Sequence, residues 1–149
     1  MRKITDLKSG IYILEIFFPS NFTVGIKKFN HIEFNDGYYY YVGSAQKNLG
    51  FRLKRHLKKE KTRHWHIDHL TTLASAEIKS ILIFEDHKKD FEEKLAADLL
   101  DDSNFSAACK GFGSGDSPKS FTHLFYSGKE SVQSQLLSKY QSAVLFTPS

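Results

Sequence analysis

The sequence has a single cysteine, no long apolar run and no apolar stretch at its N-terminus. Cys109 alone cannot form an internal disulfide bond, and a chain this poor in cysteine is typical of a reducing compartment. A membrane-spanning helix needs about 20 consecutive apolar residues, and no run in this sequence approaches that length. Residues 1–6 (MRKITD) lack the apolar core of a signal peptide. We therefore expect a cytoplasmic protein that does not associate with membranes.

The overall composition is that of a globular protein. The 149 residues are 40% hydrophobic and 26% charged, which predicts a chain that folds rather than one that stays disordered. This length suits one domain with one core. The sequence contains no internal repeat and no linker that would divide it, so we expect one domain over residues 1–149.

Acidic residues are scarce in one segment, residues 46–63. Its charges are Lys47, Arg52, Lys54, Arg55, Lys58, Lys59, Lys61 and Arg63, against Glu60 alone. The segment therefore carries a charge of +7, which leaves −3 for the rest of a chain whose net charge is +4. Such a concentrated patch is typical of a protein that binds a phosphate-bearing partner. Charge alone leaves open the alternative of a solvated, lysine-rich helix face.

Hydrophobic periodicity predicts an α+β fold. Runs of β-branched and aromatic residues predict strands at 10–17, 22–29, 38–42, 76–85 and 123–126. Apolar residues at helical spacing predict helices that begin near residues 49 and 63, and further helices over 91–100 and 132–144. The dipeptide Asp36-Gly37 is a hairpin signal, so we expect the first strands to form an antiparallel meander. Residues 110–120, rich in glycine and serine, are expected to form a loop.

Two of these elements carry side chains suited to chemistry. Alternation along the tyrosine-rich strand puts Tyr39 and Tyr41 on one face and the other two tyrosines on the opposite face. Arg52 and His56 are four residues apart and share one side of the next helix. Gly43 is expected to let the chain turn tightly between the strand and that helix. A phosphate group would then lie between phenols from the strand and cations from the helix.

Short motifs in this part of the chain resemble those of the GIY-YIG nuclease superfamily. The first motif is present literally as Gly10-Ile11-Tyr12, and the second follows about thirty positions later as Tyr41-Val42-Gly43, with valine in place of isoleucine. Arg52 resembles the family's helical arginine, and Glu92 resembles its metal-binding glutamate. The resemblance covers roughly residues 8–105. It implies a small central antiparallel sheet of about three strands flanked by helices, with residues 106–149 as a C-terminal extension.

The chain is most similar to a branch of that superfamily in which some members are fused to endonuclease III repair enzymes. The further similarity lies in residues 64–70 (HWHIDHL), 111–116 (GFGSGD) and 123–126 (HLFY). It extends the resemblance to about residue 126 and implies a role in DNA repair or recombination.

The resemblance implies a metal-dependent endonuclease that hydrolyses phosphodiester bonds, with DNA as the expected substrate and Mg²⁺ or Mn²⁺ at one weak site. The guanidinium of Arg52 is always charged, and its planar fork can bind two phosphate oxygens. Glu92 is expected to hold the metal, because Mg²⁺ prefers oxygen ligands. Tyr12 or Tyr41 would position the attacking water or accept its proton, which requires a lowered phenol pKa. His56 is an alternative proton carrier or phosphate ligand.

The remaining basic residues of segment 46–63 predict a nucleic-acid-binding surface. The residues that we expect to form it are Lys47, Lys54, Arg55, Lys58, Lys59 and Arg63. Since the chain has no separate DNA-binding domain, site specificity is expected to be low or to come from a protein partner.

Other interpretations remain open from the sequence. Residues 64–70 can order a loop over the site, start a helix or hold a structural zinc ion, although their spacing matches no standard zinc site. Residues 111–116 lack the lysine of a P-loop and follow no clear strand, which argues against nucleotide binding. Two alternative functions are a non-catalytic nucleic-acid-binding module with the same fold and an interaction domain whose tyrosines belong to the core.

Overall fold

The computed structural model of the protein describes residues 3–114 and 120–148. In chain order the elements are η1 (Ile4–Asp6), β1 (Gly10–Phe18), β2 (Gly37–Ala45), α1 (Leu49–His56), α2 (Asp68–Thr71), β3 (Glu77–Glu85), α3 (Lys89–Asp101), β4 (Ser106–Ala107), β5 (Leu124–Gly128), α4 (Gln133–Lys139) and β6 (Val144–Phe146). The predicted α+β class is thus confirmed. None of the helices in the described ranges is long and apolar enough to cross a membrane.

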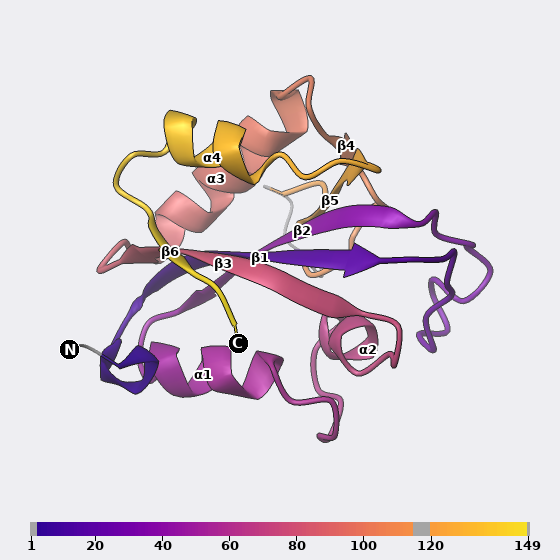
Figure 1. Cartoon of the computed structure of the whole chain (residues 1–149), viewed down its shortest axis with the longest axis horizontal. Coiled ribbons are helices and arrows are strands. Elements are labelled where there is room, and N and C mark those ends of the chain that lie inside the picture. The colour runs from indigo at the N-terminus through magenta and orange to yellow at the C-terminus, as the bar shows by residue number, and fades with distance from the viewer. Residues whose placement is uncertain (1–2, 115–119, 149) are drawn as a thin grey trace.

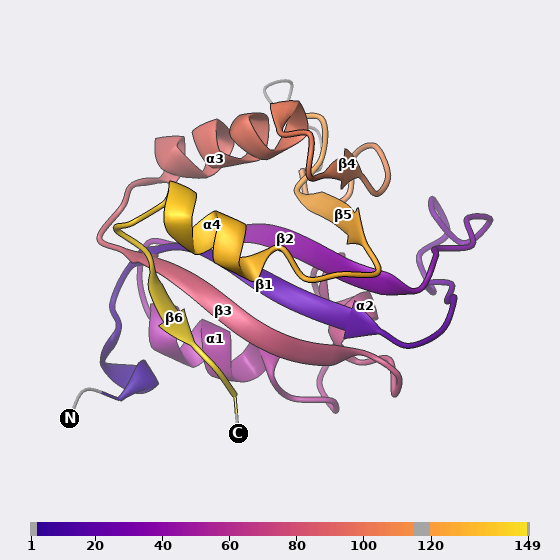
Figure 2. The ribbon, with the colours of Figure 1, turned by 45° about the horizontal axis from the view of Figure 1, so that its top comes forward.

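A six-stranded antiparallel sheet forms the centre of the fold, with the strand order β4-β5-β2-β1-β3-β6. Helices α3 and α4 cover one face of the sheet, and α1 and α2 cover the other (Figures 1 and 2). The predicted number of about three strands is therefore wrong. The three central strands are the long apolar ones, whereas the outer strands come from the C-terminal third of the chain and extend the sheet at both edges.

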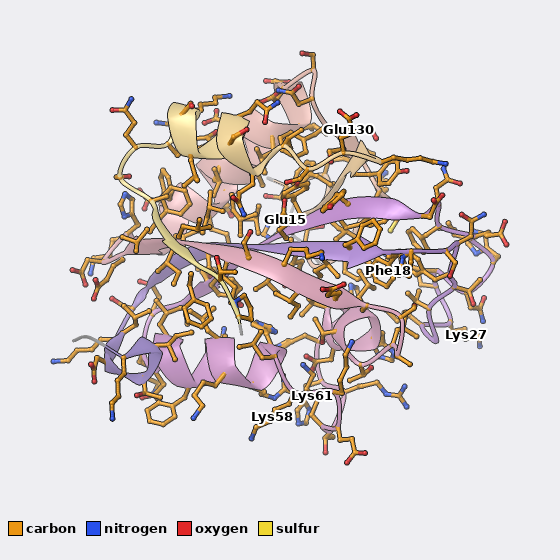
Figure 3. The ribbon with its side chains drawn as sticks, viewed as in Figure 1. Glu15, Phe18, Lys27, Lys58, Lys61 and Glu130 are labelled. Atoms are coloured by element: carbon orange, nitrogen blue, oxygen red, sulfur yellow. The ribbon has the colours of Figure 1, made fainter. Side chains whose placement is uncertain are left out.

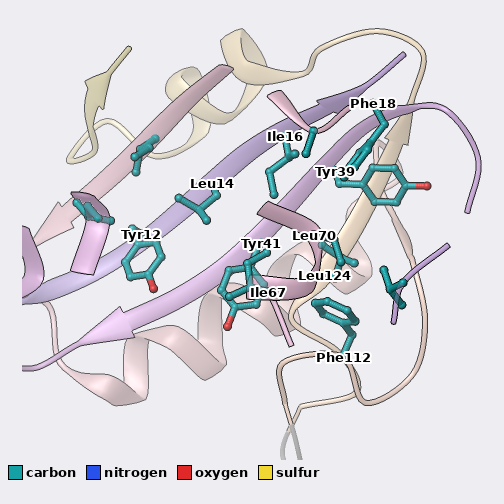
Figure 4. Packing of buried hydrophobic residues seen from close by; sticks show 14 of the residues in the cluster. Tyr12, Leu14, Ile16, Phe18, Tyr39, Tyr41, Ile67, Leu70, Phe112 and Leu124 are labelled. Atoms are coloured by element: carbon teal, nitrogen blue, oxygen red, sulfur yellow. The ribbon is translucent and has the colours of Figure 1, made fainter. Parts of the chain in front are cut away.

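Side chains of the central strands alternate between two cores, as the period of a strand requires. Tyr12, Tyr39 and Tyr41 belong to the core on the side of α1 and α2, while Ile11 and Tyr40 belong to the core under α3 and α4. Figure 4 shows part of the first core, with the rings of Tyr12 and Tyr41 on one face of the sheet and their hydroxyl groups pointing the same way. The predicted division of the tyrosines between two faces is confirmed.

Residues 22–29 do not form the predicted strand. Phe22 makes only an isolated bridge to Phe34, and its ring stacks on Phe18 and Phe34 at centroid distances of 3.7 and 5.2 Å. The aromatic residues that suggested a strand instead pack as a cluster that anchors the long β1–β2 connection. As a result β1 and β2 pair directly, from Gly10 opposite Ala45 to Phe18 opposite Gly37.

The two weaker helix predictions also differ from the structure. The helix expected from residue 63 is the single turn α2, and the helix expected over residues 132–144 ends at Lys139. Beyond it Val144–Phe146 pairs with β3 as the edge strand β6. Valine and phenylalanine suit a strand, and pairing with the apolar β3 outweighs the helical spacing of Val144.

A buried carboxylate fastens the C-terminal part of the chain to the sheet. Glu15 projects from the centre of β1 (Figure 3) and accepts hydrogen bonds from the hydroxyl groups of Tyr40, Ser80 and Ser131, at 2.7, 3.0 and 2.5 Å. The backbone N–H of Val132 donates to the oxygen of Tyr40 at 2.9 Å. These bonds satisfy a carboxylate that is only 2% exposed, and they fix the start of α4 against β1 and β3.

Candidate active site

All five residues predicted to be catalytic line one cavity of about 270 Å³, together with His123. The five are Tyr12 from β1, Tyr41 from β2, Arg52 and His56 from α1, and Glu92 from α3. The phenols and the α1 residues come from one side of the sheet, whereas Glu92 comes from the helix that covers the other side. Side chains therefore have to reach the cavity from both faces of the sheet.

The open end of β2 makes this possible. Strand β5 pairs with β2 along Tyr38–Tyr41, and the last backbone bond beyond it runs from the N–H of Val42 to the carbonyl oxygen of His123. Residues 43–45 of β2 therefore form a free edge where side chains from both faces meet. At this edge Arg52 Nη1 donates to the carbonyl oxygen of Ser44 at 2.6 Å, and the Ser44 hydroxyl donates to Glu92 Oε1 at 3.0 Å. One serine thus joins the arginine to the carboxylate.

Gly43 provides space in the middle of a strand rather than the expected tight turn. β2 continues to Ala45, and Gly43 lies directly opposite Tyr12 in the pairing with β1. A Cβ atom on residue 43 would lie 2.5 Å from Cζ of Tyr12, so a larger residue would displace the phenol ring. The glycine of the second motif therefore allows the tyrosine of the first motif to lie across it.

Tyr12 and His56 form a buried hydrogen-bonded pair, with 2.7 Å between the phenol oxygen and Nε2. Burial lowers the pKa of His56 to about 3, and the positive charge of Lys61 acts in the same direction. Burial also raises the pKa of Tyr12 well above its usual value, and the nearby phenol of Tyr41 adds to this effect. In the free protein at neutral pH the phenol is protonated and the imidazole is neutral.

We expect acidification to destabilise the fold through His56. Its pKa is about 3 in the folded protein against an ordinary 6.5. Between those values the unfolded chain binds a proton that the folded chain does not, so stability present above pH 6.5 is lost as the pH falls. The expected loss is about 1.4 kcal/mol per pH unit for this one group. Urea unfolding at a series of pH values between 7 and 4 would measure it, with ~1 pH unit between samples.

The matched variant is His56→Gln, which cannot titrate in this range. Burial also lowers the pKa of His66 and His123, so the wild-type slope contains their contributions too. The prediction therefore concerns the slope of the free energy of unfolding against pH. The difference in this slope between wild type and variant should approach the value for the uptake of one proton. Equal slopes for the two proteins would contradict it, whatever the absolute stability of the variant.

His123 is a site residue that we did not predict as such. Its Nδ1 lies 3.5 Å from Glu92 Oε2, and neither ring nitrogen has a hydrogen-bond partner among the described residues. Burial lowers its pKa, while the charge of Glu92 opposes that shift. The histidine reaches this position because its carbonyl oxygen accepts from the backbone N–H of Val42, where β5 joins β2. The only signal in the sequence was its place at the start of a motif, HLFY.

Glu92, with His123 beside it, is the candidate ligand for a divalent cation. Glu92 is 8% exposed and makes no ion pair with lysine or arginine in the described part of the chain. No group of three or more His, Cys, Asp or Glu side chains that could hold a metal occurs in residues 3–114 and 120–148. The carboxylate oxygens of Glu92 are ligands that Mg²⁺ and Mn²⁺ prefer, and a single carboxylate would hold such an ion weakly, with waters and phosphate oxygens completing its coordination.

Two of the basic residues expected to bind nucleic acid make hydrogen bonds to other groups of the domain. Arg55 donates to both carboxylate oxygens of Asp68, at 2.9 and 3.0 Å, and to the carbonyl oxygen of Thr62 at 2.6 Å. Lys59 donates to the carbonyl oxygens of Leu73, at 2.8 Å, and of Ala76. The other four members of the predicted surface, Lys47, Lys54, Lys58 and Arg63, are exposed, and Lys59 is exposed as well despite its hydrogen bonds. Lys58 extends away from the domain in the segment after α1 (Figure 3).

Residues 64–70 order the rim of the cavity. Asp68 is fully buried, and its Oδ2 also accepts from the backbone N–H groups of His64 and Trp65. Burial would raise the pKa of Asp68, but its bonds to Arg55 and to these two N–H groups lower it overall. His66 Nδ1 accepts from the N–H of Gly113 at 3.0 Å. These contacts support the loop-ordering interpretation over a structural zinc ion.

The glycine-rich motif at residues 111–116 contributes to the same rim. A Cβ atom on Gly113 would lie 2.7 Å from Cε1 of Tyr41, and its φ of +72° is one that favours glycine. Both Gly113 and Ser114 line the cavity, while Gly115 and Asp116 of this motif lie outside the described residues. The backbone at Gly113 thus packs directly against the ring of Tyr41.

Comparison with known proteins places the chain by family. No curated protein and no solved structure matches it. Residues 11–145, which include every residue that lines the cavity, match the family described as "Domain of unknown function DUF123". The chain therefore belongs to the DUF123 family.

Proposed function

We propose that this protein is a divalent-metal-dependent endonuclease that hydrolyses phosphodiester bonds in DNA, in the manner of the GIY-YIG nucleases that its motifs resemble. The observation that carries the proposal is the link from Arg52 through Ser44 to Glu92 beside the Tyr12–His56 pair. A cation, a carboxylate and a proton-transfer pair share one cavity at the open end of β2.

The carboxylate distinguishes an enzyme from a binding module. A protein that only binds phosphate gains from Arg52 but loses from a buried carboxylate beside it, because like charges repel more strongly away from water. Glu92 is useful in such a cavity when a cation lies between it and the phosphate. The pairing of Arg52 with Glu92 therefore supports metal-assisted catalysis.

Each side chain has a task in this proposal. Arg52 uses one N–H group to hold the Ser44 carbonyl oxygen and turns the rest of its fork to the phosphate, whose transition state carries extra negative charge. Glu92, with His123 beside it, would hold a divalent ion, which would supply charge neutralisation at the phosphate and a more acidic water. Tyr41 lies beside Tyr12 and orients the attacking water.

The Tyr12–His56 pair accepts the proton of that water. The phenol oxygen takes a proton from the water while the phenol proton passes to Nε2 of His56, so the net acceptor is the imidazole. Because the pKa of His56 is only about 3, this transfer is uphill in the free protein. The negative charge of a bound phosphate raises the pKa of His56, which makes the imidazole a better proton acceptor. The leaving oxygen departs as the P–O bond breaks and takes a proton from solvent.

Incubation with supercoiled plasmid and with single-stranded and double-stranded oligonucleotides tests this proposal. We expect cleavage with Mg²⁺ or Mn²⁺ and none with EDTA. The RNA counterparts of the oligonucleotides belong in the same assay. Binding without cleavage of any substrate, with any divalent ion, would refute the nuclease and leave the non-catalytic nucleic-acid-binding module. The exposed basic residues of segment 46–63 would supply the affinity in either case, so binding alone does not decide between the enzyme and the binding module.

A further inference from the structure

Trp65 is a large aromatic side chain left exposed at the cavity. Six large apolar side chains are exposed in the described residues: Phe51, Trp65, Leu100, Phe121, Val144 and Leu145. Of these six, Trp65 alone lines the cavity that holds Arg52 and Glu92. Its residue surface is 40% exposed although the adjoining Ile67 is buried.

Neighbouring residues fix the position of the indole ring. The backbone N–H of Trp65 donates to Asp68 Oδ2 at 3.0 Å, and Asp68 is fixed in turn by Arg55. The guanidinium carbons of Arg52 and Arg55 lie 4.6 and 4.7 Å from the centroid of the indole ring. Such cation–π contacts orient the ring, so it is positioned before any ligand arrives.

The indole ring of Trp65 lies next to the residue that would bind the phosphate. Arg52 contacts the indole and, in the proposed function, the phosphate to be cleaved. The nucleotide that carries this phosphate has its base within reach of the same region. A base in an intact duplex has both faces covered by its neighbours, whereas an unpaired base can turn out and stack on an aromatic ring.

We propose that Trp65 is a base-stacking residue and that the preferred substrate carries an unpaired nucleotide next to the phosphate bound by Arg52. The part of the indole that solvent now reaches would then contact the base. This inference rests on the proposed function for the identity of the bound phosphate. It adds the substrate class, which is single-stranded DNA or DNA with an unpaired base at the site.

The chain offers a direct probe, because Trp65 is its only tryptophan. The intrinsic tryptophan emission therefore reports on this one ring. We expect a short single-stranded oligonucleotide to quench the emission of the wild-type protein in EDTA. An abasic oligonucleotide of the same length, with the same phosphates and no bases, should bind with little quenching. A fully paired duplex of the same sequence should quench less than the single strand.

Two substitutions separate stacking from structure. Trp65→Leu should weaken binding of the single strand by about tenfold, as expected for the loss of one stacked base, with little effect on the abasic strand. Trp65→Phe keeps a ring and should retain most of the affinity. Phe51→Leu is the matched control, because Phe51 is an exposed aromatic residue on α1 that does not line the cavity. It should change neither affinity.

The outcomes keep the two proposals apart. Equal losses of affinity for normal and abasic strands in Trp65→Leu would show that Trp65 only orients Arg52, and would overturn the inference. So would equal quenching of the wild-type protein by both strands, a result that does not depend on how any variant folds. Base-dependent quenching without cleavage would leave the stacking role intact and refute the nuclease. Cleavage of paired and unpaired DNA at equal rates would leave the nuclease intact and refute the substrate preference.

Discussion

Glu92→Gln should abolish metal-dependent cleavage, with a loss of at least about a hundredfold, the usual cost of removing one group that stabilises the transition state electrostatically. The change keeps the size of the side chain and its contact with Ser44 but removes the charge that would hold the ion. Because it also removes a negative charge next to the phosphate, metal-free DNA binding should be unchanged or slightly tighter. Single-turnover cleavage and binding in EDTA measure the two effects separately.

Glu33→Gln is the matched control for this variant. It makes the same chemical change at an exposed residue that does not line the cavity, and it should leave cleavage and binding as in the wild type. Full cleavage by Glu92→Gln at the metal concentrations used for the wild type would contradict the assignment of Glu92. A large loss of metal-free binding would show instead that the substitution disturbs the fold of the cavity.

Arg52→Ala should lose cleavage by about a thousandfold and should also weaken binding, the opposite of the effect of Glu92→Gln on affinity. In the proposed function the guanidinium contacts the phosphate in both the ground state and the transition state, so its removal should weaken binding and also slow cleavage. Arg52→Lys should recover part of the binding but little of the cleavage, since an ammonium group lacks the planar fork. The same two assays measure these effects.

Lys54→Ala is the control on the same helix. Lys54 is exposed and does not line the cavity. Its loss should therefore reduce the slope of log affinity against log salt concentration by about the value for one phosphate contact. The rate at which the bound complex is cleaved should stay the same. An Arg52→Ala variant that cleaves as fast as Lys54→Ala would refute the role of Arg52. The result most specific to a metal-assisted phosphate site would be that Glu92→Gln and Arg52→Ala both lose cleavage while only Arg52→Ala loses affinity.

The parts of the fold that depend on local sequence were predictable. The β-branched and aromatic run from Gly10 places β1 to within one residue, and the spacing of Leu49 and Leu53 identifies the buried stripe of α1. Once Tyr12 and Tyr41 lie on one face of paired strands, the following helix carries Arg52 toward both. This is why short motifs along the chain were sufficient to predict that the candidate residues lie close together.

The other features of the fold and of the candidate site depend on contacts between residues that are far apart in the sequence. The charge of Arg55 suggests a phosphate contact, and nothing near it in the sequence shows that Asp68 neutralises it. Strands β4 and β6 are two and three residues long, too short for any periodic pattern to reveal. The approach of Glu92 from the opposite face requires the free end of β2, which exists only because β5 stops pairing at Tyr41.

The strand order also affects the kinetics of folding. Central strand β1 pairs with β2 and β3, so Gly10 meets both Ala45 and Glu85, and Glu15 is bonded to Ser131 near the other end of the chain. Such distant pairings close large loops before they gain stabilising contacts, which places folding in the range of milliseconds to seconds rather than microseconds. Tyr12, Arg52 and Glu92 meet only after β1, β2 and α3 have docked. A nascent or partly folded chain therefore carries the reactive groups apart from one another, and any capacity to cut DNA arises together with the native state.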